Sequence, residues 1–279
     1  MLSFHMGMNA AWHLKHRVPQ RATLNERARW HVADAKHCGC RPIPASVQTY
    51  LRSGNAKSTD GQPVVVGVAD HNGWAMLVTV AAIDGEPTVI DRRRVELIEK
   101  GLPSQPYHHE TTALDGTEAE QLVRKVKRSV ATSAATALEH LVADLSPQYR
   151  VASIAIREPP LEELPATVAE VHRSYYVFCR ADGMLYHSTI VSTARQLGWN
   201  VLLHRRGEEL AQAAEALRVD AADVERFIND LKSSLGPPWS AEHRNAFAAA
   251  IAGLREQSRV RLPRAAGKAN DHARRTAKR

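Results

Sequence analysis

The sequence predicts an α/β domain built on one five-stranded mixed sheet, with three antiparallel strands, then two parallel strands, and helices on its flanks. Three observations support this prediction. Apolar and helical segments follow one another in the order βββαβαβα between residues 63 and 256. The first three strands are joined by turns so short that these strands must be antiparallel neighbours. Helices precede both the fourth and the fifth strand, which implies parallel crossover connections.

The first three strands are read from apolar runs separated by turn signals. PVVVGVAD (63–70) is a continuous apolar run ending in an acid, as in a strand buried on both faces. An Asn-Gly turn leads to WAMLVTVAAI (74–83), and an Asp-Gly turn leads to TVIDRRRVELI (88–98). The third strand carries enough charge to lie near an edge. The buried first strand needs partners on both sides, so we expect it at the centre.

The remaining elements alternate between helices and strands. Residues 117–145 place their apolar side chains on one helical stripe. In the helical region that ends at Gly198, Asp182 is a plausible N-cap. The other expected elements are strands at 149–158 and 199–206, helices at 207–219 and 220–236, and a last, Ala-rich helix at 239–254.

Charge separates the ends of the chain from its middle. The net charge of +7 arises from +6 over residues 1–62, −6 over residues 63–258 and +7 over residues 259–279. Residues 1–62 show no sustained period of a helix or strand, and the last residues are poor in apolar side chains. We therefore expect a disordered basic leader (1–62), a folded domain (63–256) and a basic disordered tail (257–279). The basic ends favour contact with nucleic acid.

Compartment and metal content are read from apolar runs and cysteines. No apolar run approaches a membrane span or a signal peptide, and three cysteines are too few for a disulfide framework, so we expect a cytoplasmic protein. His31, His37, Cys38 and Cys40 are residue types that bind zinc. They lack a second cysteine pair at finger spacing, which favours an unstructured leader over a zinc site.

Two acidic residues are expected at one edge of the sheet. Asp70 ends the first strand and Glu158 ends the fourth, and open α/β sheets bind ligands at the carboxyl ends of such strands. Neighbouring carboxylates repel unless they are protonated or bridged by a cation, and Mg²⁺ prefers oxygen ligands. Glu242 and Asn245 lie three residues apart in the first turn of the last helix, so they share one face. Together these residues predict a metal site.

At these positions the chain resembles the ribonuclease-H-like superfamily, and its pattern is closest to RuvC-type Holliday-junction resolvases. That family has an Asp in its first strand, a Glu after an "AI" strand, and two Asp residues three apart opening an Ala-rich helix. The matching positions here are Asp70, Glu158, Glu242 and Asn245. The resemblance implies a nuclease that uses Mg²⁺ or Mn²⁺ to hydrolyse phosphodiester bonds in branched or structured DNA, or in an RNA–DNA hybrid, with a homodimer possible. His243 is a further candidate metal ligand, with His108 and His109 as alternatives.

The chain also departs from the family pattern. Asp70 is followed by His-Asn-Gly where the family has Pro-Gly, Asn245 replaces a carboxylate, and Arg157 lies directly beside Glu158. These departures leave a second hypothesis open, in which the site has decayed and the protein binds nucleic acid or a protein partner without cleavage. A third, a nucleotide-binding platform of the actin-like kind, would need Gly-rich phosphate loops that the sequence does not offer.

Overall fold

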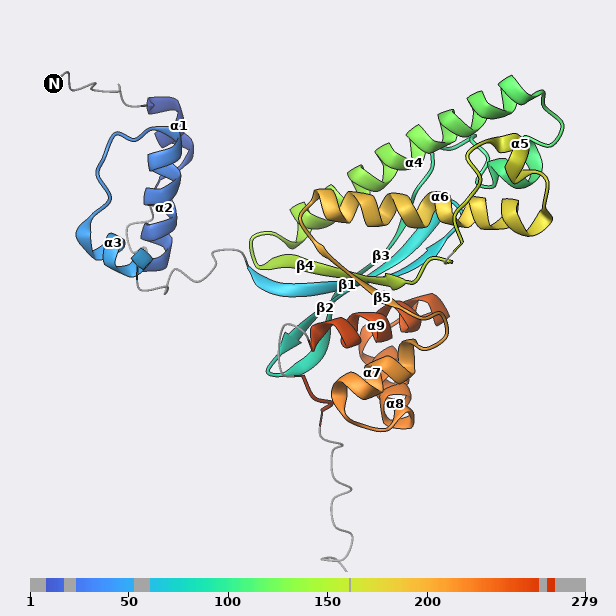
Figure 1. The fold of residues 1–279 in the computed structure, drawn as a ribbon. Coiled ribbons are helices and arrows are strands. Elements are labelled where there is room, and N and C mark those ends of the chain that lie inside the picture. The colour runs from blue at the N-terminus through green and yellow to red at the C-terminus, as the bar shows by residue number, and fades with distance from the viewer. Residues whose placement is uncertain (1–8, 18–23, 53–60, 161, 256–259, 264–279) are drawn as a thin grey trace, which may run out of the picture. The chain divides into compact units, whose positions relative to one another are not determined.

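The protein divides into two compact units, residues 1–61 and residues 62–279. The computed structural model describes residues 9–17, 24–52, 61–160, 162–255 and 260–263 (Figure 1). The second unit holds the predicted sheet, in the strand order β3-β2-β1-β4-β5. Its strands are β1 (Gln62–His71), β2 (Trp74–Ile83), β3 (Glu86–Glu96), β4 (Tyr149–Arg157) and β5 (Asn200–His204).

The directions of the strands confirm the predicted fold class. β1 pairs with β2 and β2 with β3 in antiparallel fashion, whereas β1 with β4 and β4 with β5 are parallel. This is the order predicted from the sequence, with β1 in the centre. Its valines alternate between the two faces, and both faces are buried, which explains the unbroken apolar run in the sequence.

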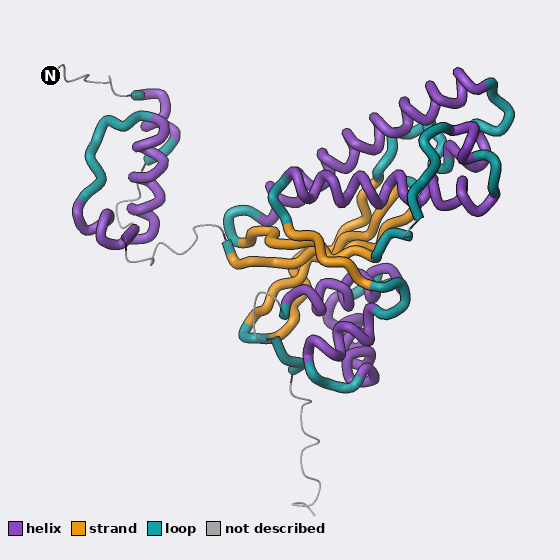
Figure 2. Tube along the Cα trace, in the orientation of Figure 1, coloured by secondary structure: helices purple, strands orange, loops and turns teal. Residues whose placement is uncertain are grey.

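Helices cover both faces of this sheet (Figures 1 and 2). One face carries α4 (Gly116–Leu145) and α6 (Tyr175–Gln196), with the short α5 (Val168–Val171) beside them. The other carries α7 (Glu209–Leu217), α8 (Ala221–Leu235) and α9 (Ala241–Leu254). The apolar stripe of α4 supplies Val126, Val130, Leu138 and Leu141 to the first core.

The last helix lies very close to the central strand. A methyl group added at Gly67 of β1 would lie only 1.7 Å from the backbone oxygen of Ala246 in α9. At the other end of α9, a methyl group at Gly253 would lie 2.6 Å from Leu202 of β5. The small residues of α9 therefore set its distance from the sheet, and this packing fixes where the N-terminus of α9 lies.

Two parts of the second unit differ from the sequence prediction. A π-helical turn, η1 (Pro106–Glu110), lies between β3 and α4, where no regular element was predicted. Asp182 was expected to cap a helix, but α6 begins seven residues earlier and Asp182 is buried inside it. Its Oδ1 accepts a hydrogen bond from the backbone N–H of Tyr107, at 2.9 Å. Asp182 therefore connects α6 to η1, a tertiary role that local sequence rules do not reveal.

The first unit was expected to be a disordered leader, and its described residues are largely helical instead. They form α1 (Ala10–Lys15), α2 (Leu24–His37) and α3 (Ala45–Arg52). Between α1 and α2 the ring of Trp12 packs against Trp30 and His37. The sequence shows no sustained apolar period even where these helices form.

None of the described helices is long and apolar enough to cross a membrane. The predicted disordered tail lies almost wholly outside the described residues. Of that stretch, only residues 260–263 are described, and there the backbone N–H of Arg261 donates to the carbonyl of Gly85.

Candidate functional site

A cleft of about 700 Å³ opens where β1, β4 and β5 end and α9 begins. We call it the strand-end cleft. Carboxylates reach it from three elements: Asp70 from β1, Glu209 from α7 and Glu242 from α9. Its cations are Arg157 at the end of β4 and Arg206 just after β5. Asn72, Asn245, His71 and His204 add further polar groups to its wall.

Asp70 and Arg157 form the central pair of the cleft. Arg157 donates from Nε to Oδ1 of Asp70 at 2.9 Å and from Nη2 to Oδ2 at 3.0 Å. Only 2% of the Asp70 side chain is exposed, against 30% of Arg157. Two parallel bonds of this kind are the strongest geometry available to an arginine and a carboxylate. Both oxygens of Asp70 are thus engaged by a cation of the protein itself.

His187 approaches the same carboxylate from α6. Its Nδ1 lies 3.7 Å from Oδ2 of Asp70, which is an ion-pair distance rather than a hydrogen bond. The ring is buried, and this nitrogen has no hydrogen-bond partner among the described residues. Burial raises the pKa of Asp70, but His187 and the Arg157 guanidinium together lower it by more than burial raises it. The pKa of Asp70 therefore lies below its ordinary value. Asp70 is therefore ionised at neutral pH.

Glu158 does not line the strand-end cleft. It is exposed and lines a neighbouring cavity of about 310 Å³, whose wall shares Arg157 and Arg206 with the cleft. The pairing of β1 with β4 ends at Gly67 and Ala155. Continued by three residues, it would set Asp70 opposite Glu158, since Val66 and Ile154 pair and both face the core under α4 and α6. Asp70 and Glu158 therefore lie at corresponding positions of adjacent strands, as expected. Arg157, the residue before Glu158, is the one that reaches Asp70.

Glu242 and Asn245 both line the strand-end cleft, as their spacing predicted. Glu242 is half-buried and Asn245 exposed. A hydrogen bond from Ser240 is the main reason that the pKa of Glu242 lies below its ordinary value. Burial lowers the pKa of nearby His71, while the charges of Glu242 and Asp70 oppose that shift. Three of the four predicted catalytic residues, Asp70, Glu242 and Asn245, therefore come together.

His243, the other predicted metal ligand, has a structural environment. It is buried, and its Nδ1 lies 2.8 Å from the Ser240 hydroxyl and 3.2 Å from the Ser240 backbone nitrogen, closing the first turn of α9. Its ring packs near Trp239. It does not line the strand-end cleft. His108 packs against Tyr175 and Phe178 and does not line the cleft either; the side chain of His109 lies outside the described residues.

Several residues of the cleft were not predicted as site residues. His204, Arg206 and Glu209 line it, and His187 lies beside it through its contact with Asp70. All four come from segments read only as helices and strands. His204 is buried, with Nδ1 3.5 Å from Glu209 and with Nε2 lacking a partner among the described residues. Arg157 was noticed beside Glu158, but its bond to Asp70 depends on the strand register. That register is a property of the sheet and not of the local sequence.

Comparison with known proteins finds matches among solved structures alone. No protein-family model matches the sequence, and no curated protein matches it either. Among solved structures, RuvC of Thermus thermophilus is similar at 11% identity and a TM-score of 0.42, over 70% of this chain and 95% of that one. The T. thermophilus RuvC in complex with Holliday junction substrate gives 13% identity and a TM-score of 0.42, over 71% and 98%. The chemistry of the cleft has to be judged from its own residues.

The donor set of the cleft does not fit two divalent cations around Asp70. A carboxylate that bridges two metals needs both of its oxygens, and here both accept hydrogen bonds from Arg157. The guanidinium already neutralises this buried charge, and a cation beside it would be repelled. Asn245 offers a neutral amide oxygen, and Glu158 lines the adjacent cavity. The arrangement is that of a charge-compensated polar cleft.

Proposed function

We propose that residues 62–255 form a ribonuclease-H-like domain that binds nucleic acid and does not cleave it by two-metal chemistry. The observation that carries the proposal is the bidentate pair of Arg157 with Asp70, at 2.9 and 3.0 Å. An ion pair of this geometry supplies, from the protein itself, the compensation that metal ions give to a nuclease carboxylate. The cleft lies at the strand ends, where active sites of such sheets occur, but the negative charge of Asp70 is not free to bind a metal.

A surface of α4 supports nucleic acid as the partner. Four exposed cations lie within five residues of this helix, and we call them the α4 basic patch: Arg124, Lys125, Lys127 and Arg128. Positions three and four apart are neighbours on a helix surface, so these side chains form one cluster. Among the residues that the structure describes, none of the four has an acidic partner within salt-bridge distance. Unpaired cations in a cluster suit the phosphates of a nucleic-acid backbone.

The composition of the chain ends supports the same partner. Residues 259–279 carry a net charge of +7 and residues 1–62 carry +6, although the intervening chain is acidic. Basic ends joined to an acidic domain give an electrostatic attraction that is independent of sequence and sensitive to salt. Branched or structured DNA is the nucleic acid that the family resemblance suggests, and an RNA–DNA hybrid is the second. A homodimer and a cytoplasmic location remain predictions.

The test is a binding assay without metal. The full chain is titrated onto a labelled four-way DNA junction, duplex DNA and an RNA–DNA hybrid in EDTA, at several salt concentrations. We expect binding without Mg²⁺ that weakens with salt. A variant with all four cations of the α4 basic patch changed to Gln should lower the salt slope by up to about 3 to 4. Arg226→Gln with Lys232→Gln, on the opposite side of the sheet, is the matched control and should bind as wild type.

A second candidate is the metal-dependent nuclease predicted from the sequence. One specific observation favours it: Asp70, Glu242 and Asn245 line one cleft at the strand ends. Mg²⁺ or Mn²⁺ would be held by Asp70, Glu158 and Glu242, and would supply an activated water and charge stabilisation. Arg157 would first have to leave Asp70. Cleavage by wild-type protein that is lost in Asp70→Asn would establish this candidate and reject the first.

A further inference from the structure

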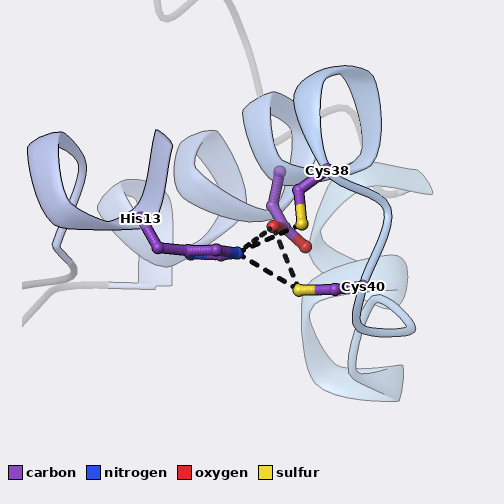
Figure 3. Close-up of side chains that lie close together, drawn as sticks. His13, Cys38 and Cys40 are labelled. Carbon is purple, nitrogen blue, oxygen red and sulfur yellow. Dashed lines mark hydrogen bonds and ion pairs between the residues drawn. The ribbon is translucent and has the colours of Figure 1, made fainter. Parts of the chain in front are cut away.

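Four metal-binding side chains meet in the first unit, which is separate in the chain from the strand-end cleft. They are His13 of α1, Asp34 of α2, and Cys38 and Cys40 just after α2 (Figure 3). Their ligand atoms all lie within 4.8 Å of one another. The sequence had suggested His31 and His37 as companions of the two cysteines. The structure instead brings His13 and Asp34 to them.

Local backbone structure explains the convergence. Asp34 and Cys38 lie one helical turn apart, so their side chains share a face. The carbonyl of Asp34 accepts from the N–H groups of Cys38 at 2.8 Å and Gly39 at 2.6 Å, and Gly39 adopts φ 64°. This left-handed residue ends the helix and turns the chain so that Cys40 returns to the cluster. His13 arrives on α1, whose first turn is capped by the Asn9 side chain.

The spacing of the ligand atoms matches a tetrahedral zinc site. Nε2 of His13 lies 3.3 Å from Sγ of Cys38, 3.2 Å from Sγ of Cys40 and 3.3 Å from Oδ1 of Asp34. Sγ of Cys40 lies 3.7 Å from that same oxygen. Zinc bond lengths in a tetrahedron give edges of about 3.6 Å for N–S, about 3.3 Å for N–O and about 3.5 Å for S–O. Each measured separation lies within about 0.4 Å of its expected edge.

Burial indicates that the cluster needs a cation. Asp34 is fully buried, and its Oδ2 has no hydrogen-bond partner among the described residues. An isolated buried carboxylate is costly unless it is paired or binds a metal. The only apolar side chains described as buried in residues 9–48 are Cys38 and Val47. Units of this size usually supplement their core with a metal or with disulfides.

We propose that His13, Asp34, Cys38 and Cys40 bind one Zn²⁺ ion that holds the first unit together. Two thiolates with an imidazole favour zinc over Mg²⁺ or Ca²⁺, which prefer oxygen ligands. The four protein ligands fill a tetrahedral shell, so the site is structural rather than catalytic. The backbone N–H of Asn9 donates to Sγ of Cys38 at 3.1 Å, an outer hydrogen bond of the kind that orients metal ligands. Binding releases the thiol protons to solvent.

The test uses the full chain and the metal alone. Protein purified with added zinc and dialysed against metal-free buffer should contain about one zinc per chain by elemental analysis. Replacing the metal with Co²⁺ should give the visible bands of a tetrahedral site and a thiolate-to-cobalt charge-transfer band. Cys38→Ser and His13→Ala should each weaken zinc binding at least tenfold, since even outer-sphere changes cost about 10- to 100-fold. His37→Gln and Cys179→Ser are matched controls and should retain the metal.

A gain-of-signal variant covers the case in which ligand-removal variants fail to fold. Asp34→Cys would supply a third thiolate, so the charge-transfer absorbance should rise by about one half as three thiolates replace two. The proposal is overturned if wild-type protein retains no zinc, if Cys38→Ser retains as much as wild type, or if Co²⁺-loaded protein lacks the thiolate band. Each of these readouts is independent of nucleic-acid binding or cleavage, so the proposed function and the zinc site fail separately.

Discussion

Removal of Arg157 should reveal how far the strand-end cleft depends on its internal ion pair. Arg157→Ala leaves the carboxylate of Asp70, whose side chain is 2% exposed, without its two charge-assisted hydrogen bonds. Breaking a buried pair by deleting one partner costs about 3–5 kcal/mol, because the remaining charge stays buried. The Arg157 side chain is 30% exposed and His187 lies 3.7 Å from Asp70, so water and the imidazole offset part of this. We expect a loss of about 2–4 kcal/mol in the free energy of unfolding.

The reciprocal change should cost less. Asp70→Asn keeps one oxygen that can accept from Arg157, and the partly exposed guanidinium can turn to water, so we expect a loss of about 1–2 kcal/mol. Urea unfolding at neutral pH measures both values, and the double variant gives the coupling energy between the two side chains. Arg206→Ala, which removes an exposed cation from the same cleft, is the control and should lie within about 0.5 kcal/mol of wild type. An Arg157→Ala protein as stable as this control would show that the ion pair of Arg157 with Asp70 does not stabilise the fold.

Three further predictions follow from packing, titration and charge. Gly67→Ala places a methyl group against the backbone of α9 and should cost about 3 kcal/mol in urea unfolding, whereas Gly116→Ala, in open space, should cost nothing measurable. Burial raises the pKa of Asp182 to about 7, so folding favours its neutral form and wild-type stability should fall as pH rises from about 4 to 7. Asp182→Asn should remove that fall and be more stable at pH 8 by on the order of 2–4 kcal/mol in thermal unfolding; equal pH profiles would contradict this. The variant with all four cations of the α4 basic patch changed to Gln should bind a DNA junction more weakly than wild type at low salt, as measured by fluorescence anisotropy. An unchanged affinity would exclude this patch as a nucleic-acid contact; its residues are Arg124, Lys125, Lys127 and Arg128.

The sheet was predictable because each of its signals is local. The buried run of β1, the two tight turns and the helices before β4 and β5 all leave patterns within short windows of sequence. Together with the crossover rule, they specify the strand order. The Ala-rich character of the last helix was equally visible in the sequence, and it accounts for the close approach of Ala246 to Gly67.

The cleft was predictable only in part, because its electrostatics depend on tertiary contacts. Convergence of Asp70, Glu242 and Asn245 follows from strand ends and helix spacing. The pairing of Arg157 with Asp70 depends on the direction in which the long arginine side chain extends. The alternation of side chains along a strand does not specify that direction. His243 shows the same limit: it was a plausible ligand by residue type, but the structure places it in the capping turn with Ser240.

The helices of the first unit were not predicted, for a related reason. Its metal-binding residues are spread over 28 positions, from His13 to Cys40, and no standard finger spacing connects them. Periodicity analysis detects apolar stripes and is insensitive to a small fold organised around polar ligands. Only the arrangement of α1 beside the end of α2 brings the four side chains together.

The proposed function depends on Arg157, which neutralises Asp70 and leaves a cleft that does not use two-metal chemistry. The most direct measurement incubates wild-type protein and Asp70→Asn with an end-labelled four-way DNA junction, in EDTA, Mg²⁺ or Mn²⁺, and resolves binding and strand cleavage in parallel. The proposal predicts a bound, intact junction for the wild-type protein under all three conditions. Cleavage that requires the divalent metal and disappears in Asp70→Asn would contradict it.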